Sequence, residues 1–157
     1  MLLAMIGAPL GGFLADTWQK RRHNARPLFC AISSCVTALA LFLTFVVFKG
    51  GLQYSTLLMV GLAAAAFVPA AAAITQDVVH PGVRATSYSF CVIVQHLLGS
   101  SLGPIFVGYV SDRTDISTAL AMLPVFALAA GILFLAGSFF YEKDLAKVEK
   151  VAISVEK

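Results

Sequence analysis

Two polar side chains inside a long apolar stretch, Gln95 and His96, are the best candidates for chemistry in this sequence. They lie about ten residues into a run from Thr86 to Val110, which at about 1.5 Å per residue is about 15 Å along a helix. An imidazole can take up or release a proton near neutral pH. The pair could therefore contact a substrate or a proton, or it could form an interhelical hydrogen bond that holds two helices together. The sequence leaves both interpretations open.

His96 and Ser100 lie four residues apart, so their side chains could hydrogen-bond on one face of a helix. A serine hydrolase needs its nucleophile and base on different elements, with an oxyanion site beside them. The sequence also lacks glycine-rich phosphate loops, and Cys30, Cys35 and Cys91 do not have the spacing of metal ligands. We therefore expect no catalytic residues, no metal ion and no cofactor.

Glycine and proline further along the same run predict a bent and closely packed helix. Gly99 and Gly103 are spaced as GxxxG, which lets a second helix approach closely. Pro104 cannot donate a hydrogen bond to the carbonyl of Ser100 and should kink the helix, and Gly108 follows one turn later. Such a kink suits a helix that bends during gating, and it also suits a helix that is bent and static.

Five apolar segments must position these residues, and they predict an all-α, polytopic transmembrane helical bundle. Four of the segments reach the length of about 20 residues that a helix needs to cross a bilayer. The first segment has the same composition but is shorter, so the chain is expected to begin inside a helix and to have four complete spans plus one truncated span. We expect a bundle at 1–141, with spans at about 1–16, 27–48, 54–76, 86–110 and 118–141, and a cytoplasmic tail at 142–157.

Composition and charge agree with a membrane protein. Hydrophobic residues make up 59% of the chain and charged residues 12%, with a mean hydropathy of +0.89. A soluble domain carries about 25% charged residues, so this chain cannot build a water-facing surface. The net charge of +3 does not indicate a nucleic-acid partner, because the basic residues gather in the loop at 20–26 and in the tail, beside the membrane.

The distribution of basic residues predicts how the chain is oriented. With the 20–26 loop in the cytoplasm, alternation of the spans leaves two basic residues outside, Lys49 and Arg113. This split follows the positive-inside rule, so we expect a multi-pass protein of the inner or plasma membrane with a cytoplasmic C-terminus. The nine basic residues expected inside are Lys20, Arg21, Arg22, Arg26, Arg84, Lys143, Lys147, Lys150 and Lys157.

Residues 12–22, with the sequence GFLADTWQKRR, resemble the loop signature of the major facilitator superfamily, G-x-L-A-D-R-x-G-R-R/K. The matching residues are Gly12, Leu14, Ala15, Asp16, Lys20 and Arg21. Thr17 and Gln19 replace an Arg and a Gly of the signature. The signature follows the second and eighth helices of the family, and the four complete spans that come after it here fit the second copy. The resemblance implies a C-terminal half, from the end of helix eight to helix twelve, with the missing N-terminal half as its partner. In the family, the Asp ties the loop to a neighbouring helix and sets the balance between inward-facing and outward-facing states.

A second stretch resembles helix eleven of the spinster-like members. These carry R-(S/A)-T, H-L-L-G-D, a (G/S)-P pair and G-x-x-S-D-R at similar spacing. The loop from Lys20 to Cys30 is also similar, whereas Ser100 stands where those members have an Asp, so any role of that carboxylate does not carry over. The matching residues are Arg84-Ala85-Thr86, His96-Leu97-Leu98-Gly99, Gly103-Pro104, Gly108 and Ser111-Asp112-Arg113.

The resemblance implies a secondary transporter that works by alternating access, with its substrate held between two six-helix halves. Spinster-like proteins imply an amphipathic, lipid-like substrate, and a sugar acid or other small organic anion symported with a cation is the alternative. The bilayer, a small-molecule substrate and H+ or Na+ would be the partners. A small helical membrane scaffold, or a half-transporter that dimerises, is the alternative to a transporter fragment.

Overall fold

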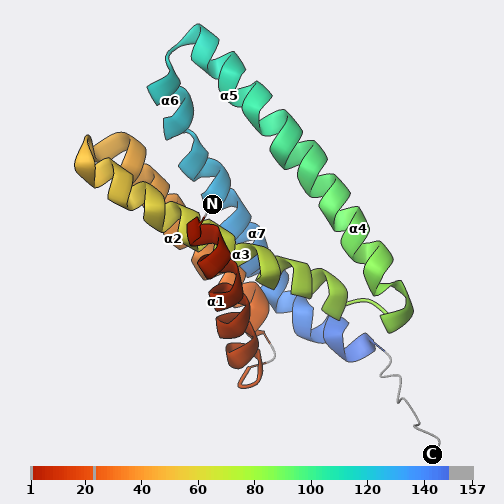
Figure 1. Ribbon diagram of the computed structural model, residues 1–157. Coiled ribbons are helices and arrows are strands. Elements are labelled where there is room, and N and C mark those ends of the chain that lie inside the picture. Colours follow the sequence, from red (N-terminus) through yellow and green to blue (C-terminus); the bar gives the residue numbers. More distant parts are fainter. Residues whose placement is uncertain (1, 23, 149–157) are drawn as a thin grey trace, which may run out of the picture.

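The computed structural model describes residues 2–22 and 24–148, which form helices joined by short connections (Figure 1). The first part of the chain contains α1 (Leu2–Gln19), α2 (Ala25–Phe42) and α3 (Gly51–Asp77). A π-helical turn, η1 (Leu43–Val47), extends α2. Gly50 adopts a φ of +73° in the turn before α3, a conformation that glycine tolerates because it has no Cβ.

The second part of the chain begins with a 3-10 turn, η2 (Pro81–Val83), followed by α4 (Arg84–Val94). A π-helical segment, η3 (Gln95–Ser101), joins α4 to α5 (Leu102–Arg113), so that the three form one long rod. The short helix α6 (Ile116–Ala121) and the long helix α7 (Leu123–Lys147) complete the described chain.

The expected all-α bundle is confirmed. Four helical stretches are long and apolar enough to cross a membrane, and α1 precedes them. The four are Ala25–Val47, Gly51–Asp77, Pro81–Arg113 and Ile116–Lys147. The boundary expected at 141–142 falls within α7, and the rest of the expected tail, 149–157, lies outside the described residues, as does Met1.

Two local features determine where α6 and α7 begin. Asp115 caps α6, accepting hydrogen bonds from the Thr118 backbone N–H at 3.1 Å and from the Thr118 hydroxyl at 2.6 Å. These bonds favour the ionised carboxylate and lower the pKa of Asp115. Pro124 occupies the first turn of α7, where its missing N–H leaves no helical hydrogen bond unmade, and the new helix therefore starts at Leu123.

Small residues bring the helices of the bundle together. A Cβ on Gly11 of α1 would overlap the backbone of Ala66 on α3, so no larger residue fits there. A Cβ on Gly131 of α7 would lie 3.1 Å from the Sγ of Cys35 on α2. Membrane helices associate through such close backbone approaches, since lipid provides no hydrophobic drive between them. The small core consists of Ala15, Cys30 and Ala70, with Phe29, Phe67, Ala71, Ile74 and Phe134 packed around it.

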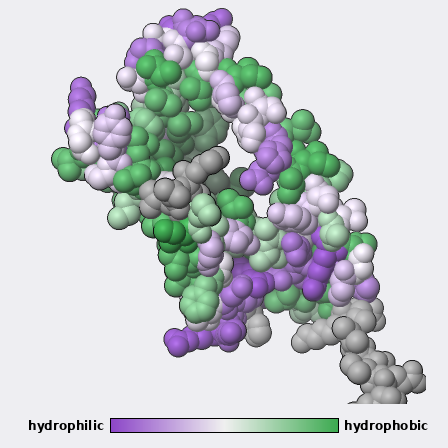
Figure 2. All heavy atoms as spheres, viewed as in Figure 1, coloured by the Kyte–Doolittle hydropathy of each residue, from purple (hydrophilic) through white to green (hydrophobic). Residues whose placement is uncertain are grey.

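The rod of α4, η3 and α5 stands apart from the other helices. Helix α2 packs along α3 and α7, and α1 packs along α3, whereas the rod has its main contacts with α3 near its start and with α6 near its end (Figure 1). None of the residues described in the rod is buried. Figure 2 shows hydrophilic residues at the two ends of the molecule and a further hydrophilic patch midway along the rod.

Candidate functional site

The ends of four helices meet in one polar cluster centred on Arg26, the second residue of α2. Its Nη2 and Nε donate to Asp16 Oδ1 of α1, at 2.7 and 3.2 Å. Its Nη1 donates to Asp77 Oδ2, on the last residue of α3. Tyr141 of α7 donates its hydroxyl to the same Asp77 oxygen at 2.6 Å. We call Asp16, Arg26, Asp77 and Tyr141 the four-helix cluster.

The helix dipoles explain why Arg26 and Asp77 are stabilised by pairing with each other. Arg26 lies in the first turn of α2, where the macrodipole disfavours a cation, and Asp77 ends α3, where it disfavours an anion. Their pairing offsets both penalties. The Arg26 and Asp77 side chains are 20% and 22% exposed, and Tyr141 is buried. Water therefore screens this part of the cluster only partly, and Arg26, Asp77 and Tyr141 hold α2, α3 and α7 together.

The loop between α1 and α2 joins the cluster through its backbone. The N–H of Arg26 donates to the side-chain oxygen of Gln19 at 3.1 Å, and the N–H of Lys20 donates to the Asp16 carbonyl at 3.2 Å. The side chains of Lys20 and Arg21 are exposed. The sequence-predicted loop residues therefore fall into two groups, with Asp16 inside the cluster and the two basic residues facing outward.

Gly12, the first residue of the loop signature, lies against α3. A Cβ there would lie 3.6 Å from the Pro69 ring, at ordinary contact distance. Gly7 and Gly11 make the closer approach to α3, because a Cβ on either would meet the backbone of that helix at under 3.0 Å. These glycines let α1 pack closely against α3, and this packing places Asp16 beside Arg26.

His96 and Gln95 lie at the start of η3 and have different surroundings. His96 Nδ1 is 3.3 Å from Ser100 Oγ, the contact that their spacing predicts, and both side chains are exposed. Gln95 lines a cavity of about 280 Å3 between α3, α4 and α7, together with Tyr88, Cys91 and Phe134. Of the two, His96 is the favoured candidate, because the H-L-L-G resemblance includes it and an imidazole can carry a proton, and the roles of both residues in binding stay predictions.

The π-helical form of η3 is related to Pro104. A proline at this position removes the hydrogen bond to Ser100 and crowds its carbonyl. The backbone widens into π-helical turns over Gln95–Ser101, immediately before α5, and this moves the carbonyls away from their usual partners. Such π-helical insertions occur frequently at functional sites.

The glycine face of the rod has no partner within the described chain. A Cβ added to Gly99, Gly103 or Gly108 would find no atom within 4 Å among the described residues. Gly99 and Gly103 instead line a groove of about 420 Å3, which Leu123 and Phe126 of α7 border on the other side. Arg84, at the start of the rod, is exposed. The structure thus leaves the predicted close-packing face open.

Sequence reasoning missed three of the four cluster residues. Arg26 enters the sequence analysis only among the basic residues that predict orientation, and none of the motifs described there includes Asp77 or Tyr141. The missed signal is that charges of opposite sign end successive spans on the same side, which places them at one level in the membrane. Among the described residues, no group of three or more His, Cys, Asp or Glu side chains could hold a metal ion.

The fold and the cluster together define a polytopic membrane protein whose spanning helices are tied at one end by an ion-pair network. The family model described as Major Facilitator Superfamily matches residues 1–104. This chain therefore belongs to the Major Facilitator Superfamily, a family of membrane transporters.

Spinster-type proteins are among the relatives. The chain is 28% identical to the sphingosine-1-phosphate transporter SPNS2 of Xenopus tropicalis, over 96% of this chain and 32% of the relative. It is 31% identical to SPNS2 of Mus musculus, over 87% of this chain and 28% of the relative. It is 32% identical to Protein spinster of Drosophila melanogaster, over 71% of this chain and 19% of the relative. The chain thus spans about a third or less of the length of these curated relatives.

Proposed function

We propose that this chain forms part of a secondary transporter that works by alternating access, and that the four-helix cluster is its conformational latch. The observation that supports the latch is that Arg26 joins carboxylates from α1 and α3, while Tyr141 adds α7. While it is formed, the network holds the four helices together at one end. Breaking and reforming such a network is a common way to switch between packed states.

The remaining helices of the transporter are the partner that this proposal requires. The rod of α4, η3 and α5 presents an open glycine face, which suits close packing with a further helix. The chain would supply about a third of the complete helical bundle. The substrate would lie between the two halves of that bundle. The same open face favours the second candidate, a half-transporter that dimerises.

The proposed substrate is amphipathic and lipid-like, because two relatives are named sphingosine-1-phosphate transporters. A small organic anion, such as a sugar acid symported with a cation, is the alternative. H+ or Na+ would supply the coupling, and His96 is the proposed proton-sensitive group. The proposed location is the inner or plasma membrane, with the basic loop and the C-terminus in the cytoplasm.

The test compares uptake by the chain alone with uptake by a chimera in which it replaces the matching third of the Xenopus tropicalis relative. Both proteins are placed in vesicles at equal amounts and assayed with labelled sphingosine-1-phosphate and gluconate, with and without proton or sodium gradients. We expect saturable uptake of sphingosine-1-phosphate by the chimera and none by the chain alone. Saturable uptake by the chain alone would instead support the dimerising half-transporter. A correctly inserted chimera that transports neither compound would contradict the proposal.

A further inference from the structure

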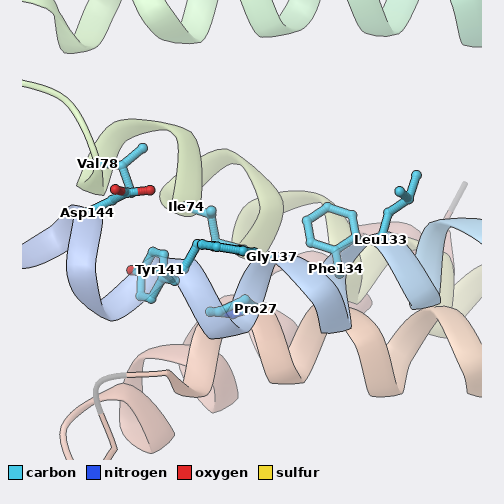
Figure 3. Close-up of a pocket in the computed structure, with 9 residues that line it drawn as sticks. Pro27, Ile74, Val78, Leu133, Phe134, Gly137, Tyr141 and Asp144 are labelled. Atoms are coloured by element: carbon cyan, nitrogen blue, oxygen red, sulfur yellow. The ribbon is translucent and has the colours of Figure 1, made fainter.

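A groove beside the four-helix cluster shares Tyr141 with it but is not used in the proposed latch. It encloses about 490 Å3 between α2, α3 and α7. Figure 3 shows Tyr141 near one end of the groove and Leu133 near the other, with Ile74 of α3 and Pro27 of α2 on its sides. Phe134 separates this groove from the cavity that Gln95 lines, because its ring borders both.

The length of the groove matches one leaflet of a bilayer. Its lining on α7 runs from Leu133 to Asp144, which at about 1.5 Å per residue corresponds to about 16 Å. Half of a hydrocarbon core of about 30 Å is about 15 Å. The end at Asp144 lies on the side of the basic loop, since Tyr141, one turn earlier, contacts the cluster there.

The groove is apolar at the end inside the membrane and polar at the other end, as a lipid molecule is. The interior end is lined by Leu133 and Phe134, and the middle by Ile74 and Phe140. Gly137 leaves the floor open, because a Cβ there would find no atom within 4 Å among the described residues. An acyl chain could therefore lie over Gly137 with no polar group buried beneath it.

Asp144 lines the polar end of the groove, and Lys147, just beyond the lining, pairs with it. Asp144 Oδ1 lies 3.3 Å from Lys147 Nζ, and the two side chains are 50% and 77% exposed. Such an exposed pair contributes little to stability, so both groups are free to exchange partners. A carboxylate beside an ammonium group complements a headgroup with a primary amine and a phosphate.

We propose that the groove binds one acyl chain of an aminophospholipid from the leaflet on the basic-loop side, with the headgroup amine at Asp144 and the phosphate at Lys147. Spanning helices are surrounded by lipid. The groove is about as long as one leaflet is thick, it changes from apolar to polar as a lipid molecule does, and charged side chains lie at its polar end. The bound chain packs against the ring of Tyr141, whose hydroxyl holds Asp77. The inference rests on membrane insertion and is independent of transport.

Photolabelling of the whole chain in phosphatidylcholine vesicles tests the site. The probe is phosphatidylethanolamine with a diazirine on its acyl chain, and labelled peptides are identified by mass spectrometry. We expect labels to concentrate on residues 133–144 and 74–78. Gly137→Phe fills the floor and should lower this labelling by about five-fold, a difference of about 1 kcal/mol. The matched control is Gly61→Phe, since Gly61 of α3 also has open space around it and does not line the groove.

Asp144→Asn tests the headgroup assignment. The substitution should lower the labelling by the phosphatidylethanolamine probe to that by a phosphatidylcholine probe with the same acyl chain, without changing helicity measured by circular dichroism.

Labels spread evenly over all lipid-facing helices, and unchanged by Gly137→Phe, would overturn the proposal. So would a groove that stays unlabelled while other faces are labelled, which would show that a protein segment fills it. An unchanged preference for phosphatidylethanolamine in Asp144→Asn would overturn the headgroup contact. Uptake plays no part in these outcomes, so they are independent of the latch proposal.

Discussion

Arg26 joins two carboxylates that differ in their exposure to water. This difference predicts which of the two contacts contributes more to stability. The Asp77 side chain is 22% exposed, whereas that of Asp16 is 58% exposed. Exposed ion pairs are screened and contribute little, while a hydrogen bond to a partly buried charge contributes more. The Arg26–Asp77 contact is therefore expected to dominate stability, and the Arg26–Asp16 contact to be easier to open.

Substitutions in the cluster should follow this ranking. Arg26→Gln should lower the free energy of unfolding in detergent micelles by about 1.5–3 kcal/mol, because it leaves Asp77 without its charged partner. Tyr141→Phe removes one hydrogen bond to the Asp77 carboxylate and should cost about 1.5–3 kcal/mol. Asp16→Asn should cost at most about 1 kcal/mol. Denaturant titration of the purified chain measures all three. A larger loss for Asp16→Asn than for Arg26→Gln would contradict the ranking.

The loop signature in the sequence identified Asp16 but could not identify its partners. Alternation of the spans places Asp16, Arg26 and Asp77 at the same side of the membrane, so a cluster of helix-end charges could be expected. Which helices are neighbours depends on packing between segments far apart in the sequence. Asp77 and Tyr141 lie 64 positions apart. No local pattern contains that contact.

His96 is the residue for which a pH dependence is expected. In the transporting chimera, His96→Ala should weaken substrate binding or shift the pH dependence of uptake, since it removes the proposed proton-sensitive group. Ser100→Ala removes the hydrogen-bond partner of His96 and keeps the imidazole, so it serves as the control. Uptake is measured against pH and normalised to surface expression. An unchanged affinity and pH profile in His96→Ala would make His96 a structural residue.

At the scale of elements, the rod of α4, η3 and α5 differs most from the rest of the molecule. It combines a π-helical segment, Pro104 and few contacts with the other helices. Hydropathy predicted the rod as one span, and Pro104 predicted a distortion. The π-helical form over seven residues could not be predicted, because a proline is also compatible with a simple kink.

Pro104→Ala should make the rod more regular. Alanine restores an N–H that can donate to Ser100 and removes the ring that crowds that carbonyl. Spin labels at Ser87 and Ser111 report the length of the rod by pulsed electron resonance, and we expect a shifted and narrower distance distribution. Pro69→Ala, which alters α3 outside the labelled pair, should leave the distribution unchanged. If Pro104→Ala also leaves it unchanged, Pro104 does not cause the distortion.

At the scale of the whole molecule, the arrangement of charge predicts one orientation in the membrane. Hydropathy predicts the four spans because each is a property of a single segment, and the structure confirms that four helices have the necessary length and composition. The order in which these helices pack is a property of the whole chain. The contacts of α2 with α7 and of α1 with α3 could not be derived from the spans alone.

Cysteine labelling tests the orientation. In a background without Cys30, Cys35 and Cys91, a cysteine at Gly51 should react with a membrane-impermeant maleimide from outside the cell. A cysteine at Gly82 should react only after permeabilisation, because it lies on the side of the basic loop. Both glycines are exposed, so the two sites are comparable. The reverse pattern would show that the basic loop lies outside.

Initial rates of uptake by three versions of the chimera test whether the four-helix cluster is the functional site of this chain. The versions carry Arg, Lys or Gln at position 26 and are compared at equal surface expression. Lysine keeps the charge but cannot donate to Asp16 and Asp77 through a planar fork. We expect the highest rate for the parent chimera, an intermediate rate for Arg26→Lys and the lowest for Arg26→Gln. Equal rates for all three would contradict the claim.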